Sequence, residues 1–518
     1  MVGVRVAVVV VVLVGIVCGD AAAEARLVGP GHPYAKPCQA IAAASAGDVV
    51  QIDAAGNGGY DGDVCASGVA NLTIEGVNGR ARIDAAGQSS GGKAIWVLSG
   101  AGTVVRNVEL SGAKVPDRNG AGIRLEGGSL TLVGSSLHDN EDGILVGNVG
   151  TIDLTIEGSS FANNGYGDGQ SHNIYVGAIH RFTMRYSASR GAKVGHLVKS
   201  RAAINDISYN RLTGEGSTDS YEIDLPNGGR SKLVGNIIQQ GPKTENPALL
   251  AYGLEGATNA DSQLTVVNNT FVNDRPGNAT AVNVDGSVTS PAVVANNIAT
   301  GTTTFVSQGS ALLSGNCLAA DPAFVDRNAL DYHLLEGSPC REAGNPAPPG
   351  GLPTEQYVYD LGHAPRSTYG ARPDAGAFEW APAASGGGGT TPAPAPGPGG
   401  GGTTPRTPRP VSIVSQRVRR DGSVRLTLKV TAAGRVSATE RATAGGRRVT
   451  YASGTARARR AGTIALTLRP TRAGARTLRR RHRLTVTVSI ALRRTDATIA
   501  RRTTTLKLRR TAAGVRRG

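Results

Sequence analysis

Short aliphatic runs that end in Gly or Asn recur along the chain from Gly47 to Thr300. Examples are NLTIEG, AGIRLEGG, DGILVGN, HNIYVG and SYEIDLPNGG. A second phrase lies between them, as in SLTLVGSSLHDN and AVVANNIAT, where aliphatic and polar residues alternate and an Asn follows near a bend. Alternation with a period of two indicates a strand with one buried face. The pattern therefore predicts many short strands separated by bends.

These strands recur at a limited range of spacings. One apolar position taken from each of six successive phrases gives separations of 21, 30, 24, 25 and 27 residues. A period of this size indicates a solenoid, in which each repeat stacks on its neighbours. The equivalent positions are Ile123, Ile144, Ile174, Val198, Ile223 and Leu250.

No amphipathic segment of helical length separates the strands. That excludes leucine-rich, ankyrin and TPR solenoids, as well as βαβ folds. We therefore predict an all-β fold, a right-handed parallel β-helix, in which inward Val, Ile and Leu side chains of one coil stack on those of the next. Asn tolerates left-handed backbone and its amide can bond to the coil above. Bend or ladder positions are accordingly expected at Asn140, Asn164, Asn210, Asn236, Asn269 and Asn297.

The open ends of a β-helix expose unpaired sheet edges and need covers. The segment GPGHPYAKPCQAIAAASAGDVV predicts an N-terminal cap with a short helix over Ala40 to Ala44. At the other end, the phrases DPAF, YHL, GSPC and DAGAFEW resemble the closing segment of secreted bacterial right-handed β-helix proteins related to pectate, alginate and chondroitin lyases. The resemblance covers about residues 26–380 and implies the architecture rather than the chemistry.

Charge divides the chain into two parts. The whole sequence carries 55 Lys and Arg against 39 Asp and Glu, a net charge of +16. From Arg406 onward there are 30 basic and 3 acidic residues, a net charge of +27, so the remaining residues carry −11. Between the two parts, residues 381–410 form a linker rich in Gly, Pro and Thr that cannot build a core. We therefore expect an acidic β-helix over residues 26–380 and a separate basic module over residues 411–518.

Apolar residues alternate with Thr or Arg in the C-terminal module, in phrases such as SVRLTLKVTAAG and RLTVTVSIAL. About seven strands in roughly 100 residues predict a small immunoglobulin-like β-sandwich, followed by a short basic tail. The module resembles the Arg-rich C-terminal modules of exported actinobacterial proteins. Its arginines either reflect codon bias and solvated strand faces, or bind an anionic cell-wall polymer or polysaccharide through paired hydrogen bonds. Nucleic acid is a disfavoured partner, because the chain is expected to be exported and stacking aromatics are missing.

The N-terminus is typical of a secretory signal peptide over residues 1–25. Arg5 precedes an apolar run from Val6 to Val17, and small residues follow at Ala21 to Ala23. The run is short for a bilayer span, and no other segment is long and apolar enough. We expect a secreted or cell-surface protein. Lipid attachment at Cys18 is the less favoured alternative, because the preceding Val17 is bulky for that processing.

Four cysteines remain after the predicted cleavage, and four cysteines allow three pairings. Cys38 and Cys65 are close in sequence, as are Cys317 and Cys340, and the two pairs lie at opposite ends of the acidic part. Exported proteins can keep disulfides, whereas the chain has no CxxC motif for zinc. We expect these two local disulfides, each worth about 3 kcal/mol in the chain-entropy treatment.

The stretch GHLVKSRAAINDISYN, residues 195–210, carries the strongest catalytic signal. It is similar to the active coil of the chondroitinase B and alginate lyase group, where a Lys-Ser pair carries the base that removes the proton next to a uronate carboxylate. The resemblance implies that Lys199 is the base. Arg201 is the second candidate catalytic residue, because its nearby charge would lower the pKa of Lys199. In that group the next coil brings an Arg before an Asn-Gly turn, but here YEIDLPNGG places Asp224 three residues before Asn227.

This departure leaves two interpretations open. A free Lys has a pKa of about 10.4 and is rarely neutral at pH 7, and an unliganded Asp224 would raise the pKa of Lys199 further. If Glu222 and Asp224 held a Ca²⁺ ion, which takes several oxygen ligands, the sign of that effect would reverse. Otherwise Lys199 and Asp224 form a surface ion pair between coils, worth about 0–1 kcal/mol.

Other candidates flank this coil. His196 and Asn227 are candidate substrate-binding residues, and the insertion GYGDGQSHN, residues 165–173, is expected to wall a groove in which Tyr166 stacks on a sugar ring. The acidic bend HDNEDG is expected to be a solvated turn. The remaining histidines of the repeat, His138, His172 and His180, are expected to be structural or exposed.

Taken together, the sequence predicts a secreted β-helix protein that acts on or binds an acidic polysaccharide. Lyase-type β-elimination at Lys199 is the catalytic form of this hypothesis. The alternative is a non-catalytic cell-surface adhesin or envelope-binding protein, which would be retained on the same polymers without releasing a product.

Overall fold

The computed structural model describes residues 23–359, 361–382, 411–418, 423–430, 434–444, 447–458, 462–481, 483–494, 499–511 and 514–517. The chain divides into two compact units, Met1–Gly388 and Gly389–Gly518, which are described separately. The predicted signal peptide over residues 1–25, including Cys18, and the predicted linker over residues 381–410 lie almost wholly outside the described residues. Both stay predictions.

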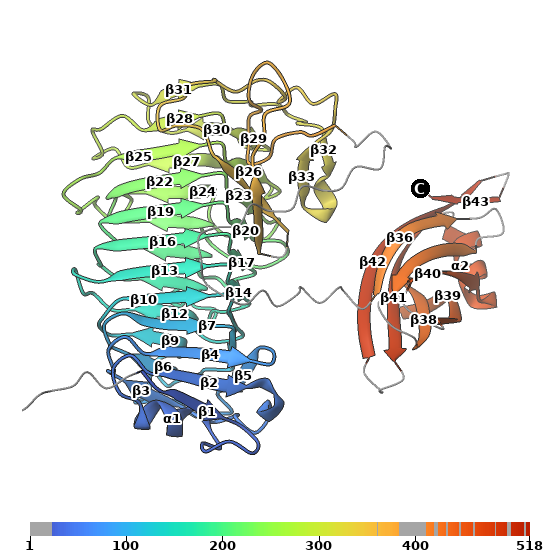
Figure 1. Ribbon diagram of the computed structural model, residues 1–518. Coiled ribbons are helices and arrows are strands. Elements are labelled where there is room, and N and C mark those ends of the chain that lie inside the picture. The colour runs from blue at the N-terminus through green and yellow to red at the C-terminus, as the bar shows by residue number, and fades with distance from the viewer. Residues whose placement is uncertain are drawn as a thin grey trace, which may run out of the picture. The chain divides into compact units, whose positions relative to one another are not determined.

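Three long parallel sheets, here called A, B and C, build the first unit, and the chain passes through A, C and B in turn in each coil (Figure 1). Sheet A contains β1 (Ala25–Val28), β2 (Val49–Asp53), β4 (Thr73–Val77), β7 (Thr103–Arg106), β10 (Leu130–Val133), β13 (Asp153–Glu157), β16 (Arg181–Arg185), β19 (Ile204–Ser208), β22 (Arg230–Val234), β25 (Leu264–Val267), β28 (Val293–Ala295) and β31 (Leu312–Ser314). Sheet B contains β3 (Cys65–Ser67), β6 (Ala94–Leu98), β9 (Ala121–Leu125), β12 (Asp142–Val146), β15 (Ile174–Val176), β18 (Val198–Ser200), β21 (Ile223–Leu225), β24 (Ala248–Tyr252), β27 (Thr280–Val284) and β30 (Thr304–Val306). Sheet C contains β5 (Ala81–Asp84), β8 (Val108–Ser111), β11 (Ser136–His138), β14 (Ser160–Ala162), β17 (Ala188–Arg190), β20 (Arg211–Thr213), β23 (Ile237–Gln240), β26 (Thr270–Asn273) and β29 (Ile298–Thr300).

The strand register stacks the repeating apolar positions one above the other. Ile144 pairs with both Ile123 and Ile174, and Ile223 pairs with both Val198 and Leu250. All of these side chains are fully buried in one continuous core. Burial of one such side chain contributes about 1.5–3 kcal/mol, so the core of small aliphatics is sufficient for a long rod. The parallel β-helix predicted from the repeat is confirmed.

The predicted asparagines form buried ladders at two bends, and all six positions are confirmed. Between sheets C and B, Asn140 donates from its side-chain amide to Asn164 at 3.2 Å. Between sheets A and C, the amide donations run in succession, at 2.8–3.1 Å, along Asn210, Asn236, Asn269, Asn297 and Asn316. The left-handed backbone falls one residue before the ladder, with φ of 54–57° at Asn163, Asn268 and Asn296. At each of these bends one residue thus adopts the left-handed backbone, and the next residue forms the ladder hydrogen bond.

A short helix covers the N-terminal end of the β-helix. Helix α1 (Pro37–Ala43) begins three residues earlier than the sequence predicted, because Pro is favourable at the first helical position. Ala40 and Ile41 pack into the main core, and the Cys38–Cys65 disulfide ties α1 to β3. A single 3₁₀ turn, η1 (Ala54–Gly56), follows β2.

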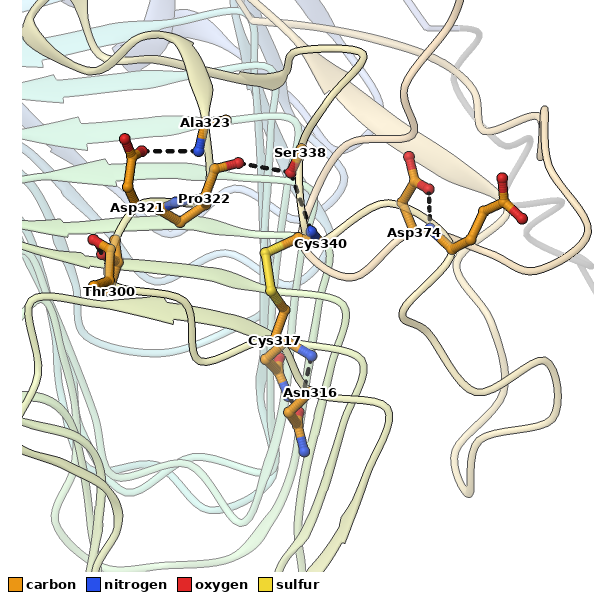
Figure 2. Close-up of a disulfide and its surroundings, with 12 residues drawn as sticks. Thr300, Asn316, Cys317, Asp321, Pro322, Ala323, Ser338, Cys340 and Asp374 are labelled. Carbon is orange, nitrogen blue, oxygen red and sulfur yellow. Dashed lines mark hydrogen bonds between the residues drawn. A yellow bond between two sulfur atoms is a disulfide. The ribbon is translucent and has the colours of Figure 1, made fainter.

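The Cys317–Cys340 disulfide closes a loop in the C-terminal cap (Figure 2). The hydroxyl of Ser338 accepts the N–H of Cys340 at 3.1 Å and donates to the carbonyl of Pro322 at 2.6 Å. Phe378 of the DAGAFEW phrase is buried in the cap's own core. The two predicted disulfides, Cys38–Cys65 and Cys317–Cys340, are both confirmed. The elements of the cap are β32 (Phe324–Asp326), η2 (Arg327–Ala329), β33 (Asp331–Leu334), β34 (Glu355–Val358) and β35 (Gly362–Pro365).

The second unit is an antiparallel β structure with the strand order β36-β37-β40-β39-β38-β41-β42-β43. Val424, Leu426 and Leu428 are buried while Arg425 between them is exposed, so the predicted alternation and a separate module built mainly of β-strands are confirmed. Helix α2 (Arg472–Arg481) was not predicted, because its sequence RAGARTLRRR holds a single large apolar residue. The strands are β36 (Val411–Val418), β37 (Val424–Val430), β38 (Gly434–Ala444), β39 (Arg447–Ala458), β40 (Gly462–Pro470), β41 (Arg483–Arg494), β42 (Ile499–Thr511) and β43 (Gly514–Arg517). Among the helices that the structure describes, none combines the length and the apolar character needed to cross a bilayer.

Candidate functional site

Four successive coils of sheet B carry polar and aromatic residues on their outer face, where side chains one coil apart lie in columns. Two such columns are named here by their order along each strand. The second column runs through Leu145, Tyr175, Lys199 and Asp224, which are consecutive partners in the strand register. The first column runs through Asp142, His172, His196 and Tyr221, and the ring of His196 stacks on His172 at 4.7 Å and on Tyr221 at 5.1 Å. Some equivalent positions in the flanking coils hold small residues, such as Ala121 beside Asp142 and Ala251 beside Asp224, but β9 places Arg124 beside Leu145. The two columns themselves therefore lie on β12, β15, β18 and β21.

Lys199 lies at the centre of this surface and is held by two carboxylates. Its ammonium group lies 3.0 Å from Asp224 Oδ2 and donates to Glu255 Oε1 at 2.7 Å. Burial alone would lower the pKa of Lys199, but the two carboxylates outweigh it and the net shift is upward. The next residue, Ser200, faces the core and donates to Asn205. The Lys-Ser pair thus places the Lys outside and the Ser inside, and the Lys is charged.

Arg201 follows at the end of β18 and is bound on three sides. Its guanidinium donates to Glu255 Oε2 at 2.5 Å, to Asn227 Oδ1 at 2.6 Å and to the hydroxyl of Tyr175 at 3.1 Å. Asn227, predicted to bind substrate, therefore orients Arg201. Lys199 and Arg201 share one carboxylate, since they bind the two oxygens of Glu255.

The two stacked histidines are neutral and hold one tautomer. Nδ1 of His172 accepts the backbone N–H of His196 at 2.9 Å, and Nδ1 of His196 accepts the backbone N–H of Tyr221 at 3.1 Å. A neutral ring with an accepting Nδ1 carries its proton on Nε2. Burial and the charge of Lys199 lower the pKa of His196 to about 3, and burial lowers the pKa of His172 as well. Both rings therefore act as Nε2–H donors rather than bases.

Asp142 is a site residue that the sequence did not reveal. The HDNEDG bend was expected to be a solvated turn, and this expectation is wrong, because Asp142 is 1% exposed and Glu141 is 5% exposed. Asp142 Oδ1 accepts the backbone N–H of His172 at 2.6 Å, while Oδ2 has no partner among the described residues. Burial raises the pKa of Asp142 well above its usual range. Burial therefore favours the protonated form of this carboxyl in the first column.

The two residues predicted to hold Ca²⁺ are separated by the wall of the β-helix. Glu222 lies in register with the core residues Leu197 and Leu249 and is fully buried, and burial and the neighbouring Asp219 raise the pKa of Glu222. Asp224 faces outward and pairs with Lys199. No group of three or more His, Cys, Asp or Glu side chains suited to a metal ion occurs in the described part of the chain. The residues on this surface therefore do not fit a Ca²⁺ site built from Glu222 and Asp224.

A cleft of about 600 Å³ opens over these columns. The insertion over residues 165–173 contributes Gly169 and Gln170 to its lining, in agreement with the prediction that it walls a groove. Tyr166 is not part of the lining and is 48% exposed, with the guanidinium of Arg118 lying 4.7 Å from its ring centroid. Further lining residues are Asn119, Arg124, Glu126, Asp142, Leu145, Asn148, His172, Tyr175, Lys199, Arg201 and Glu255.

Two of the missed residues left a usable signal in the sequence. His172 and Tyr175 belong to the HNIYVG phrase, which aligns with HLVKS one coil later, so the repeat itself places them beside His196 and Lys199. The repeat could not place Glu255 beside Lys199 and Arg201, because Glu255 follows β24 in a loop that folds back over two coils.

No protein-family model matches this chain, and a search of curated proteins finds no match either. The similarity of the Lys199 coil to polysaccharide lyases therefore stays a resemblance. What the cleft can bind has to be argued from its own geometry.

Proposed function

We propose that this chain is an exported protein that binds an acidic polysaccharide in the cleft on sheet B. The observation that carries the proposal is the shared carboxylate: Lys199 and Arg201 bind the two oxygens of Glu255 at 2.7 and 2.5 Å within an open cleft. A uronate carboxylate has the same chemistry. The cleft's volume of about 600 Å³ lies within the usual range of ligand sites, roughly 300–1,000 Å³.

The rest of the cleft supplies uncharged partners for sugar hydroxyls. The Nε2–H group of His172 and the hydroxyl of Tyr175 are uncharged donors among the lining residues. A combination of one cationic pair with uncharged donors suits a sugar that bears one carboxylate and several hydroxyl groups.

Binding without chemistry is better supported than elimination by Lys199. A base must lose its proton, yet the pKa of Lys199 is raised, and the residues on the surface do not fit a cation that would acidify the substrate. Lyase-type elimination stays the catalytic alternative. It requires Lys199 to be released from both Asp224 and Glu255 when substrate enters.

Affinity electrophoresis of the full chain in gels with polygalacturonate, alginate, chondroitin sulfate or neutral dextran tests the proposal. We expect retardation by at least one acidic polymer and none by dextran. The double variant Lys199→Met, Arg201→Met isolates the contribution of the cleft from that of the basic second unit. Equal retardation of the double variant and the wild type would contradict the proposal. Ultraviolet absorbance of unsaturated uronates, followed in parallel, distinguishes lyase activity from binding alone.

The second unit offers a separate anionic-polymer surface. Alternate residues of its strands are exposed arginines, such as Arg425 and Arg435, and helix α2 exposes Arg472, Arg476 and Arg480 at a spacing of four, which places them on one face. We propose that this unit holds the protein on an anionic cell-wall polymer. Changing the three α2 arginines to Gln in the full chain should weaken retention on wall preparations, and a chain ending before Arg406 should lose it. Full retention of the shortened chain would contradict this role.

A further inference from the structure

The carboxylate between Lys199 and Arg201 belongs to the protein itself. Glu255 lies three residues after β24, whereas the two cations lie on and directly after β18, two coils away. Partial burial acts to raise the pKa of Glu255, but hydrogen bonds from Lys199 and Arg201 outweigh it and hold the pKa below its usual range. Glu255 is therefore a charged carboxylate placed where a bound uronate would put its own.

The loop that carries Glu255 is fixed by its backbone. We call residues 253–262 the return loop. Its backbone N–H groups at Glu255 and Asn259 donate to the carbonyls of Pro226 and Asn227 at 3.1 and 2.9 Å. The side chain of Asn259 reaches the carbonyl of Ala202 at 3.1 Å. The return loop thus crosses the coil of β21 and is anchored on the coil of β18.

Only the side chain of Glu255 has to move to free the two cations. That side chain is 45% exposed, and exposed side chains change rotamer within picoseconds to nanoseconds. Lys199 and Arg201 stay in place without Glu255, because Asp224 also holds Lys199, and Tyr175 and Asn227 also hold Arg201. The carboxylate-binding pair is therefore preformed and closed by a single movable group.

We propose that Glu255 is an internal competitor that occupies the carboxylate subsite and sets the affinity with which the cleft binds a uronate. An external carboxylate must displace it. The apparent affinity is therefore the intrinsic affinity of the free subsite multiplied by the fraction of molecules in which the subsite is free. The proposal rests on the proposed function for the identity of the ligand, a uronate polymer, but not for the existence of the subsite.

The first test compares Glu255→Gln with a matched variant in the same cleft. Glu126 also lines the cleft, where Lys93 and Arg124 bind it at 3.1 and 2.8 Å, so Glu126→Gln removes the same charge without opening the subsite. If the subsite is free in about a tenth of the molecules, Glu255→Gln should bind polygalacturonate about tenfold more tightly than wild type. Glu126→Gln should gain only the charge effect, about twofold at moderate salt.

Titration calorimetry at one pH and salt concentration gives these affinities. If the wild type binds a uronate polymer and Glu255→Gln binds it equally or more weakly, Glu255 contacts the ligand instead of competing with it, and the inference is overturned. If the two Gln variants gain equally, the effect is one of charge alone, with the same consequence.

A second test does not depend on any polysaccharide. Glu255→Ala leaves the two cations without their shared carboxylate, and free acetate can take its place. The melting temperature of Glu255→Ala should rise in sodium acetate over sodium chloride at equal ionic strength and pH, whereas the wild type should show no such difference. Should neither the wild type nor Glu255→Gln bind a uronate polymer, the proposed function fails, but acetate rescue would still support the subsite. Absence of acetate rescue would overturn the inference by itself.

Discussion

Glu222 and Asp224 are two residues apart, but they lie on opposite sides of the β-helix wall. Alternation along a strand would place them on the same side. The bend before β21 breaks that alternation, so Glu222 and the following Ile223 are both fully buried, between the equivalent residues of the neighbouring coils. Asp224 instead lies within 3.0 Å of the ammonium group of Lys199. The role of a carboxylate in this fold is therefore decided by its position in the coil rather than by its distance along the chain.

Carboxyl groups on the inner and outer surfaces of the β-helix wall differ in whether they have a cationic partner. Inside, Glu222 is next to Asp219 and burial raises the pKa of both groups, so the protonated forms are favoured. Outside, Asp224 is paired with Lys199, and Glu255 with both Lys199 and Arg201. An inner carboxyl costs stability whenever it ionises, whereas an outer one organises the cations that a ligand would contact.

The largest effect is expected from removing the cation on the outer surface. Lys199→Ala leaves Asp224, which is 3% exposed, without its charge partner. Breaking one side of a buried ion pair costs about 3–5 kcal/mol. The free energy of unfolding can be followed in urea by tryptophan fluorescence, because both tryptophans, Trp96 and Trp380, lie in the first unit.

A double variant separates the two consequences of that change. Lys199→Met with Asp224→Leu replaces the pair by apolar groups of similar size, which is often neutral or stabilising. This variant should recover the stability of the wild type without recovering uronate binding. Recovery of binding as well would remove Lys199 from the ligand site.

On the inner surface, the same kind of change should stabilise the protein. Glu222→Leu places a Leu in register with Leu197 and Leu249 and removes a fully buried acid that lies beside Asp219. We expect a gain of about 1–4 kcal/mol at neutral pH, by analogy with apolar replacements of buried ionic groups. Melting curves at several pH values measure the gain.

The stabilisation by Glu222→Leu should increase as the pH rises. The pKa of Glu222 is raised in the fold, so its protonated form contributes stability below its usual pKa of 4.5, and this contribution is lost as the pH rises toward the folded value. The advantage of Glu222→Leu over wild type should therefore be larger at pH 8 than at pH 4.5. A constant difference would show that Glu222 does not titrate on unfolding.

The sequence was sufficient to predict the outward pair of Lys199 and Asp224, but not the inward position of Glu222. The repeat predicted that Val198 and Ile223 stack, and it therefore placed Lys199 beside Asp224 as well. It could not predict that Glu222 points inward, because the alternation that assigns faces along a strand fails at a bend. Asp142 was missed for a related reason. Asp142 accepts the backbone N–H of His172 from the next coil, and the insertion between the two residues hides this contact in the sequence.

The ladders between sheets A and C should tolerate changes less well than exposed positions. Asn236 accepts the amide of Asn210 and donates to the side chain of Asn269 and to the carbonyl of Ile207. Asn236→Ala leaves these buried groups unpaired, at a cost of about 1–3 kcal/mol. The exposed Asn328→Ala is the control and should change the unfolding free energy by less than about 0.5 kcal/mol. Equal effects at the two positions would mean that the ladder adds nothing to stability.

The smallest effect is expected at the rim of the outer surface. Tyr166 is 48% exposed on the insertion that walls the cleft, and the guanidinium of Arg118 lies against its ring. One face of that ring is thus occupied, and only the other is free to stack on a sugar. Tyr166→Ala should weaken uronate binding by about two- to tenfold, as expected for a single aromatic contact of roughly 0.5–1.5 kcal/mol, and should leave the melting temperature unchanged. Tyr166→Phe keeps the ring and should bind as the wild type does. A loss in Tyr166→Phe equal to that in Tyr166→Ala would assign the effect to the hydroxyl, and with it a hydrogen bond instead of stacking.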